Sequence, residues 1–326
     1  MLKFAKNQMV VDLDLEAVSP LLIKDGRMSD DQRQKWEPDK KKREQMPTAI
    51  PISRNSVEEI GRAVKGEGSL DRCSRDLRFY LPGSSLKGAW RSHLERTLRG
   101  LTSEEDGMVC DPLDDEKDDA KQGPCVSCST VLEKQKNDKG FDAYKQSCLI
   151  CRIFGNTVTG SRLKISDGVN VKEGVTKLVQ REHVALNRQN GQVTRGPLKF
   201  YAIQEEKFKV TLTLRNFELR HLKLVGILLA DLGGERVPIG SGKSKGYGKV
   251  KAHIRSIQLT HYGLESPGPV LRGWEGKEDE IVFPDAWKVQ FSEWEWNQAL
   301  TPPEFFKQIQ GISMNWAKVP RLASRV

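Results

Sequence analysis

The sequence has no apolar run approaching the roughly 18 residues of a membrane-spanning helix. Its first residues, MLKFAKNQMVVDLDLE, lack the apolar core of a secretory signal peptide. No HExxH, GxSxG or protein-kinase motif is present, and the five histidines are scattered. These absences argue against a membrane protein and against the common hydrolase and kinase classes. They predict a cytoplasmic protein with no membrane partner.

The glycine-rich stretch PIGSGKSKGYGKV (238–250) contains GSGKS and looks at first like an ATP-binding P-loop. A Walker A loop also needs a glycine five positions before its Gly-Lys, and that position is Val237. Residues 249–257 alternate like a strand, whereas a P-loop opens a helix. A Walker-type ATP site is therefore excluded. The stretch still suits a loop that holds phosphates through its four glycines and Lys243, Lys245 and Lys249.

The charge is unevenly distributed along the 326 residues. Residues 104–119 carry nine acidic side chains and one lysine, so a formal charge of +9 for the whole chain leaves +17 on the rest. A basic body with one acidic segment is typical of a protein that binds a polyanion, most simply nucleic acid.

Hydrophobic periodicity predicts an α+β fold. Residues 9–18 alternate like a half-buried strand, and a helix is expected from Ser84 or Ser85, which could cap it, to about residue 101. The Asn190-Gly191 pair indicates a hairpin, followed by a strand, a second helix and the strand 249–257. Helices on one face of an antiparallel sheet, in a ferredoxin-like core, are the economical arrangement.

Several segments interrupt or follow this core, which we assign to residues 1–263. Residues 24–78 lose periodicity and are interpreted as a long, partly mobile insertion. An acidic, cysteine-bearing insertion spans 104–151, and a tryptophan-bearing C-terminal extension covers 264–326. We expect the extension to dock on the core or on a neighbouring subunit.

Four cysteines form two C-x2-C pairs, CVSC and CLIC, separated by 19 residues. This spacing fits a structural zinc site, because each pair can present two thiolates to one tetrahedral ion. Free buried thiols are the alternative. The expected ligands are Cys125, Cys128, Cys148 and Cys151, and Cys110 could replace one of them. Such a site would hold an insertion with too little apolar sequence to fold alone.

Four motifs, in order, resemble the RAMP superfamily of CRISPR RNA-binding proteins. LPGSSLKGAWRSHLE is similar to its G-S-S-[LI]-[KR]-G-x-x-R helix start, and GSGKSKGYGKVK to its C-terminal glycine-rich loop. CLICRIFGN and REHVALNRQNGQV resemble segments of the backbone subunits of type III effector complexes, the second being their thumb. The resemblance covers residues 9 to about 260.

The resemblance implies a ferredoxin-like, RRM-related core with a β-hairpin thumb at 168–203. It implies a crRNA-binding backbone subunit that joins other subunits of a type III complex and cleaves guide-paired target RNA at regular intervals. The implied RNA-binding residues are Gly83, Ser84, Ser85, Lys87, Arg91, Arg181, Arg188, Arg195, Gly240, Gly242, Lys243, Lys245 and Gly246.

Cleaving members use one aspartate on the loop after the first strand. Here the candidates are Asp25, Asp30 and Asp31, with Asp25 favoured because it follows the strand directly. A carboxylate there could orient a ribose hydroxyl or a divalent ion, Mg²⁺ or Mn²⁺. These residues alone leave open whether the chain is an enzyme.

Two alternatives within the family are a non-cleaving structural subunit of the same complex and an endoribonuclease that processes precursor crRNA. A zinc-ribbon transcription regulator is disfavoured, because acidic residues flanking the cysteines would repel DNA.

Overall fold

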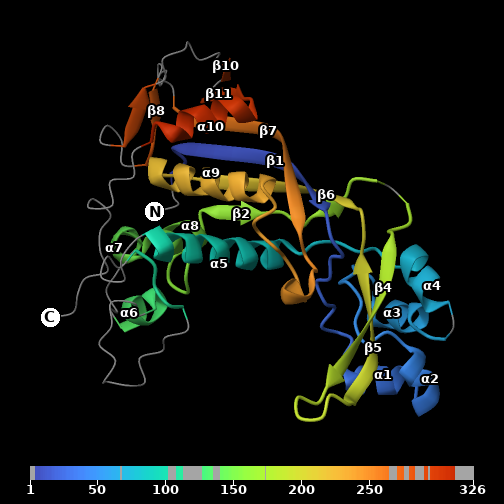
Figure 1. Cartoon of the computed structure of the whole chain (residues 1–326). Coiled ribbons are helices and arrows are strands. Elements are labelled where there is room, and N and C mark those ends of the chain that lie inside the picture. The colour runs from blue at the N-terminus through green and yellow to red at the C-terminus, as the bar shows by residue number, and fades with distance from the viewer. Residues whose placement is uncertain are drawn as a thin grey trace.

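An antiparallel sheet forms one layer of the molecule, with helices on one of its faces (Figure 1). The computed structural model describes residues 4–66, 68–101, 108–112, 127–134, 140–172, 174–263, 270–274, 279–282, 290–292 and 294–312. The strands lie in the order β10-β11-β7-β1-β6-β2, and β3 also pairs with β6. Their bounds are β1 (Asn7–Ala17), β2 (Leu163–Ile165), β3 (Val169–Asn170), β6 (Lys207–Arg215), β7 (Val250–Tyr262), β10 (Gln290–Ser292) and β11 (Glu295–Leu300).

Apolar and polar side chains alternate along β1, so one face of the sheet is buried and the other is polar. Met9, Val11 and Leu13 are at most 1% exposed, as predicted for a half-buried strand. On the opposite face the carboxylate of Asp12 accepts hydrogen bonds from hydroxyls on both neighbouring strands, and Glu16 lies 3.2 Å from the ammonium of Lys207 on β6. Charge pairing across strands therefore allows this face to remain open to solvent.

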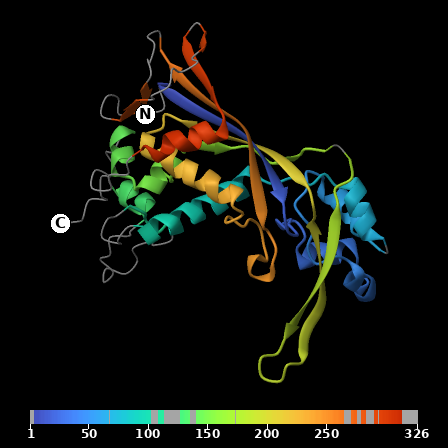
Figure 2. The same cartoon turned by 45° about the horizontal axis from the view of Figure 1, so that its top comes forward.

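Helices cover the buried face (Figure 2). They are α5 (Gly83–Leu101) and α9 (Leu219–Gly233), with α10 (Pro302–Gln310) beside α9. On α5, Trp90, Leu94 and Leu98 are fully buried. Along the chain, β1 is followed by α5 and β2, and β6 by α9 and β7, while these four strands lie in the order β7-β1-β6-β2. The α+β prediction is confirmed.

The C-terminal extension docks on the core, which is one of the two arrangements expected. Strand β11 pairs with β7, and α10 packs closely on Gly226 of α9, where an added Cβ would clash with Ile309. Strands β8 (Val270–Arg272) and β9 (Glu280–Val282) form a separate two-stranded sheet. Trp287 and Trp316 lie outside the described residues.

In its described residues, the insertion at 24–78 contains four short helices: α1 (Asp30–Trp36), α2 (Lys40–Gln45), α3 (Val57–Ala63) and α4 (Ser69–Asp76). Ser29 and Asp39 cap α1 and α2, and Ser56 forms a capping box at the start of α3. Because α1 and α2 bury no residue, they leave no apolar period in the sequence. The caps are the local signal that the interpretation of this insertion missed.

The hairpin of β4 (Leu178–Leu186) and β5 (Val193–Ile203) projects away from the sheet and the helical layer (Figure 2). We call it the thumb hairpin. Its root is held by backbone hydrogen bonds from Tyr201 to Ala49 of the insertion and between Ile203 and Leu21. The hairpin expected around Asn190-Gly191 is confirmed, with its turn spanning 187–192.

The described part of the cysteine-bearing segment consists of residues 108–112 and a helical portion with the short helices α6 (Cys128–Lys134), α7 (Phe141–Gln146) and α8 (Leu149–Phe154). Every residue of α8 is buried. The guanidinium groups of Arg152 and Arg162 lie over the Tyr144 ring, 4.9 and 3.9 Å from its centroid. These cation–π contacts attach the segment to the core.

No helix in the described part of the chain is long and apolar enough to cross a membrane.

Acid should weaken this fold through His261 on β7, which is 9% exposed. Burial, with a contribution from Arg272, lowers the pKa of His261 to about 4. The unfolded chain then binds more protons, so stability falls as pH drops from about 6.5 to about 4. His261→Gln is expected to remove on the order of 2 kcal/mol of that pH dependence, measured by urea unfolding at several pH values. The exposed His253→Gln is the matched control and should retain it.

Candidate metal centre and nucleic-acid interface

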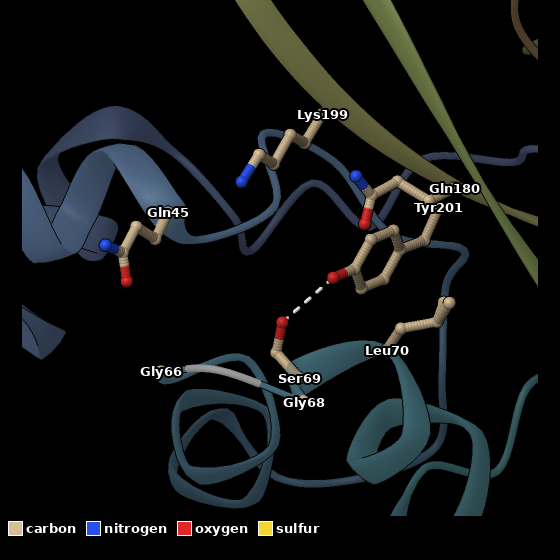
Figure 3. A pocket seen from close by; sticks show the side chains of 8 residues that line it. All are labelled: Gln45, Gly66, Gly68, Ser69, Leu70, Gln180, Lys199 and Tyr201. Carbon is tan, nitrogen blue, oxygen red and sulfur yellow. Dashed lines mark hydrogen bonds between the residues drawn. The ribbon is translucent and has the colours of Figure 1, made fainter.

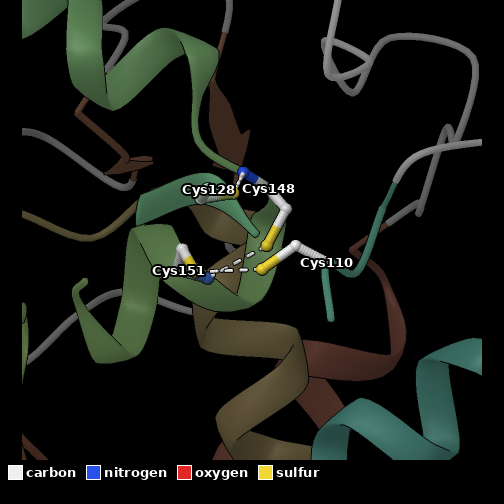
Figure 4. Close-up of side chains that lie close together, drawn as sticks. All are labelled: Cys110, Cys128, Cys148 and Cys151. Carbon is white, nitrogen blue, oxygen red and sulfur yellow. Dashed lines mark hydrogen bonds between the residues drawn. The ribbon is translucent and has the colours of Figure 1, made fainter. Parts of the chain in front are cut away.

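Four buried cysteines converge between α6, α8 and the segment after α5 (Figure 4). They are Cys110, Cys128, Cys148 and Cys151, and their sulfur atoms all lie within 4.8 Å of one another. In a tetrahedral zinc tetrathiolate, Zn–S bonds of about 2.3 Å place the sulfurs about 3.8 Å apart. The described cluster fits such an ion, and four thiolate ligands would leave no open coordination position.

The local backbone conformation orients the cysteine sulfur atoms of the cluster. Cys148 is the N-cap of α8, and its Sγ accepts a hydrogen bond from the Cys151 amide. The Cys148 amide in turn donates to the Cys128 Sγ at 3.2 Å. Amide donors around sulfur favour the thiolate form that binds metal. Without a cation, hydrogen bonding with Cys110, and then with the other two cysteines, raises the pKa of Cys128.

The described cluster contains three of the four cysteines expected as ligands, together with the cysteine that could replace one of them. Cys128, Cys148 and Cys151 are brought together as expected, and Cys110 joins them. Cys125 lies outside the described residues. Cys73 is buried within α4 and is not part of the cluster.

Arg91 contacts this cluster from α5. Its guanidinium donates to the Cys151 Sγ at 3.3 Å, to the Gly155 carbonyl at 3.1 Å and to the Glu95 carboxylate at 2.8 Å. The family resemblance implied that Arg91 binds RNA. Its contacts with Cys151 and Gly155 arise because α5 packs against α8, and no local sequence pattern encodes that packing. A positive charge at a thiolate offsets the negative charge of a four-thiolate site.

Replacing Arg91 with methionine should therefore weaken zinc binding by about 10- to 100-fold, the range usual for residues that support metal ligands. Competition with a chelating dye measures this affinity. The exposed Arg96→Met, on the same helix, is the matched control and should bind zinc as the unchanged protein does. Equal zinc affinity in both variants would contradict a supporting role for Arg91.

The start of α5 lies at the end of the helical layer nearest the thumb hairpin (Figure 1). Gly83 approaches the backbone of Ile165 so closely that a Cβ would stand 2.5 Å from its carbonyl oxygen. The Gly83 amide donates to the Asp167 carboxylate at 2.9 Å, so a distant residue, rather than Ser84 or Ser85, accepts this amide hydrogen bond. Ser84 and Ser85 are exposed and Lys87 is half-buried, with its pKa lowered by burial and by Arg91.

The glycine-rich loop folds back on the segment that follows β1. Gly240, Gly242, Gly246 and Gly248 all have φ near +80°. A Cβ on Gly240 would also clash with the Leu22 carbonyl at 2.5 Å, so this tight path requires glycine. The loop contains the 3₁₀ turn η2 (Lys243–Lys245), whose two lysines are exposed. This conformation leads into strand β7 and confirms that the loop does not open a P-loop helix.

The glycine-rich loop contacts the thumb hairpin through an aromatic cluster. The Tyr247 hydroxyl and the His183 Nε2 share a hydrogen bond of 2.8 Å, and the His183 ring packs edge-on against Phe200. Burial, helped by Lys245, lowers the pKa of His183 and favours its neutral ring near neutral pH. This contact, which the sequence did not reveal, fixes the hairpin relative to the loop.

The thumb hairpin presents basic and apolar side chains to solvent. Arg181 and Arg188 are exposed, while the Arg195 side chain falls outside the described part of the structure. Val184, Leu186 and Val193 are 51%, 58% and 58% exposed near the tip. Large apolar side chains exposed together on a small projection commonly mark an interaction surface.

The three candidate aspartates have different environments. The Asp25 side chain is 1% exposed, and both of its oxygens accept hydrogen bonds from Arg27, which also donates to the carbonyls of Ser53 and Asn55. Asp30 pairs with Arg33 but remains 73% exposed. Asp31, in the first turn of α1, is exposed, and its carboxylate has no hydrogen bond or ion pair with any residue that the structure describes.

A family model of the RAMP superfamily matches residues 14–251. The chain therefore belongs to this superfamily, which is associated with CRISPR complexes and implies RNA as a partner. A search among curated proteins found no match.

Proposed function

We propose that the chain is a crRNA-binding backbone subunit of a type III CRISPR effector complex. Its strand order, β7-β1-β6-β2, with α5 and α9 on one face, is the arrangement expected of a ferredoxin-like, RRM-related core. The proposal is carried by one observation above all: a basic thumb hairpin with apolar side chains near its tip is fixed, through His183 and Tyr247, to the lysine-bearing glycine loop.

The glycine loop suits the phosphate backbone of a guide RNA, and the thumb hairpin suits its bases. The glycine loop would hold backbone phosphates with Lys243 and Lys245, a contact that carries no sequence information. The thumb hairpin would insert Val184, Leu186 and Val193 among the bases, where side chains can displace or stack on them. In the assembled complex, base pairing with the guide would then select the target.

We propose further that the subunit cleaves target RNA with a carboxylate of the insertion and Mg²⁺ or Mn²⁺. Asp31 has the accessible carboxylate that this role needs, whereas Asp25 would first have to release Arg27. The ion pair of Asp25 supports the second candidate function, a non-cleaving backbone subunit of the same complex. Cleavage by assembled complexes that carry a variant of Asp25, Asp30 or Asp31 distinguishes the two.

Zinc is the proposed structural metal, bound by Cys110, Cys128, Cys148 and Cys151. Bound zinc would cross-link the segment after α5 to α6 and α8. Arg91 extends the same connection to α5, whose first turn lies at the proposed RNA-binding end of the helical layer.

RNA binding tests the central proposal. Changing both Lys243 and Lys245 to Glu should lower the affinity for single-stranded guide RNA at least about tenfold and reduce the salt slope by about 1.4. Both values can be measured by fluorescence anisotropy at several salt concentrations. The same charge change at Lys207 and Lys209, on the open sheet face, is the matched control. Equal losses in the two double variants would indicate a general charge effect and contradict the assignment of the loop.

A further inference from the structure

A cavity of about 340 Å³ lies between one side of the thumb hairpin and the insertion helices α2 and α4 (Figure 3). Gln180 and Tyr201 are directly opposite each other on β4 and β5 and line it with Lys199, while the insertion contributes Gln45 and Ser69. Its volume is at the lower end of the roughly 300–1,000 Å³ of small-molecule sites. The cavity is on the other side of the hairpin from the His183–Phe200–Tyr247 cluster, because those hairpin residues alternate with its lining residues.

The polar groups of the cavity are incompletely paired within the protein. The Lys199 ammonium and the Gln45 amide both line the cavity and have no hydrogen-bond or ion-pair partner in the described part of the chain. Gln180 donates its Nε2 to Glu182 at 3.1 Å, which leaves its amide oxygen available. The buried hydroxyls of Ser69 and Tyr201 lie 2.8 Å apart, so this pair uses only one of their two hydrogens.

The walls of this cavity are held in place. Backbone hydrogen bonds join Thr48 to Lys199 at 2.7 Å and Tyr201 to Ala49 at 2.9 Å, so the chain just after α2 is fixed to β5. The Ser69–Tyr201 hydrogen bond fixes the start of α4 to the same strand. The backbone segments that carry Lys199 and Gln45 are therefore held in a defined relative position before any ligand arrives.

We propose that this cavity binds a single nucleotide. Lys199, the one charged side chain of the described lining, would hold its phosphate. The amides of Gln45 and Gln180 offer the paired donors and acceptors that match the edge of an unstacked base. Gly66 and Gly68 also line the cavity and add no side chain of their own to it. As a site for a nucleotide of an RNA strand, the inference rests on the proposed RNA-binding function.

The test uses the full-length protein and two probes. One is an RNA duplex containing a single unpaired 2-aminopurine nucleotide, compared with the same duplex fully paired; the other is AMP, measured by equilibrium dialysis. We expect the unpaired nucleotide to change fluorescence on binding, or AMP to bind saturably. Lys199→Met and Gln45→Met should each weaken that signal by at least about tenfold, as expected for loss of a polar contact to an anionic or base group. Lys209→Met, on the open sheet face, should leave it unchanged.

The outcomes separate this proposal from the function on which it rests. If both duplexes bind with equal affinity and fluorescence response, and AMP does not bind, the cavity proposal is overturned while RNA binding stands. If no RNA binds, the proposed function fails and the AMP measurement alone decides the cavity. A loss with Lys209→Met equal to that with Lys199→Met would also overturn it, because the effect would then follow net charge. Saturable AMP binding without a response from the duplex would assign the cavity to a free nucleotide.

Discussion

Replacing Cys110 with serine is expected to weaken zinc binding at least about 100-fold, because each thiolate supplies roughly a quarter of a binding free energy of about 10–16 kcal/mol. The Cys110 sulfur lies 3.5 Å from that of Cys151, inside the four-sulfur cluster. Zinc content after dialysis, measured by mass spectrometry of metals, reports the loss. The midpoint of thermal unfolding should fall as well, since bound zinc would hold α6 and α8 to the segment after α5.

Cys125→Ser is the decisive comparison for this site. If the cluster of Cys110, Cys128, Cys148 and Cys151 is the ligand set, the Cys125 variant should keep one zinc per chain at unchanged affinity. Loss of zinc from the Cys125 variant, with retention in the Cys110 variant, would instead support the two C-x2-C pairs as ligands. Retention in both would show that neither cysteine is required.

Replacing Asp31 with asparagine is expected to lower target cleavage by the assembled complex about 10²- to 10⁴-fold, the range for removal of a general acid–base group. Asparagine keeps the shape of the side chain, and the exposed position at the start of α1 has no partner in the described structure to lose. Guide binding and thermal stability should therefore stay as they are. Product bands after a timed reaction with Mg²⁺ or Mn²⁺ measure the rate.

Asp25→Asn and Asp30→Asn complete this experiment. The Asp25 variant breaks a pair with Arg27 that anchors the loop after β1 to Ser53 and Asn55, so it should lose stability. A cleavage defect in that variant counts for catalysis only if its unfolding midpoint is unchanged. Normal cleavage in all three variants would support the non-cleaving backbone subunit.

The elements of the core could be predicted because their residues alternate or repeat by local rules. Apolar positions two apart predicted β1 and β6, and those three or four apart predicted α5 and α9. The helices of the insertion escaped this reasoning, since helices that bury nothing have no such period. Their capping residues can be recognised in the sequence, but a capping residue predicts a helix only weakly when no apolar face follows it.

The sequence by itself determined the periodic core, the cysteine-rich segment, the exclusion of a Walker loop and the four motifs of the RAMP superfamily. It could do so because each depends on neighbouring residues or on fixed spacing. Only the tertiary structure brought Cys110, which the sequence offered as an alternative ligand, into the four-cysteine cluster beside Cys151. Only the tertiary structure directed Arg91 toward Cys151, placed Asp167 at the start of α5 and paired Asp25 with Arg27. The first three join residues 41, 60 and 84 positions apart in the chain. The Asp25–Arg27 ion pair was not predicted, although its residues are two apart in the sequence. Burial decides whether a carboxylate is exposed to solvent or paired with a cation, and the sequence does not reveal which residues are buried.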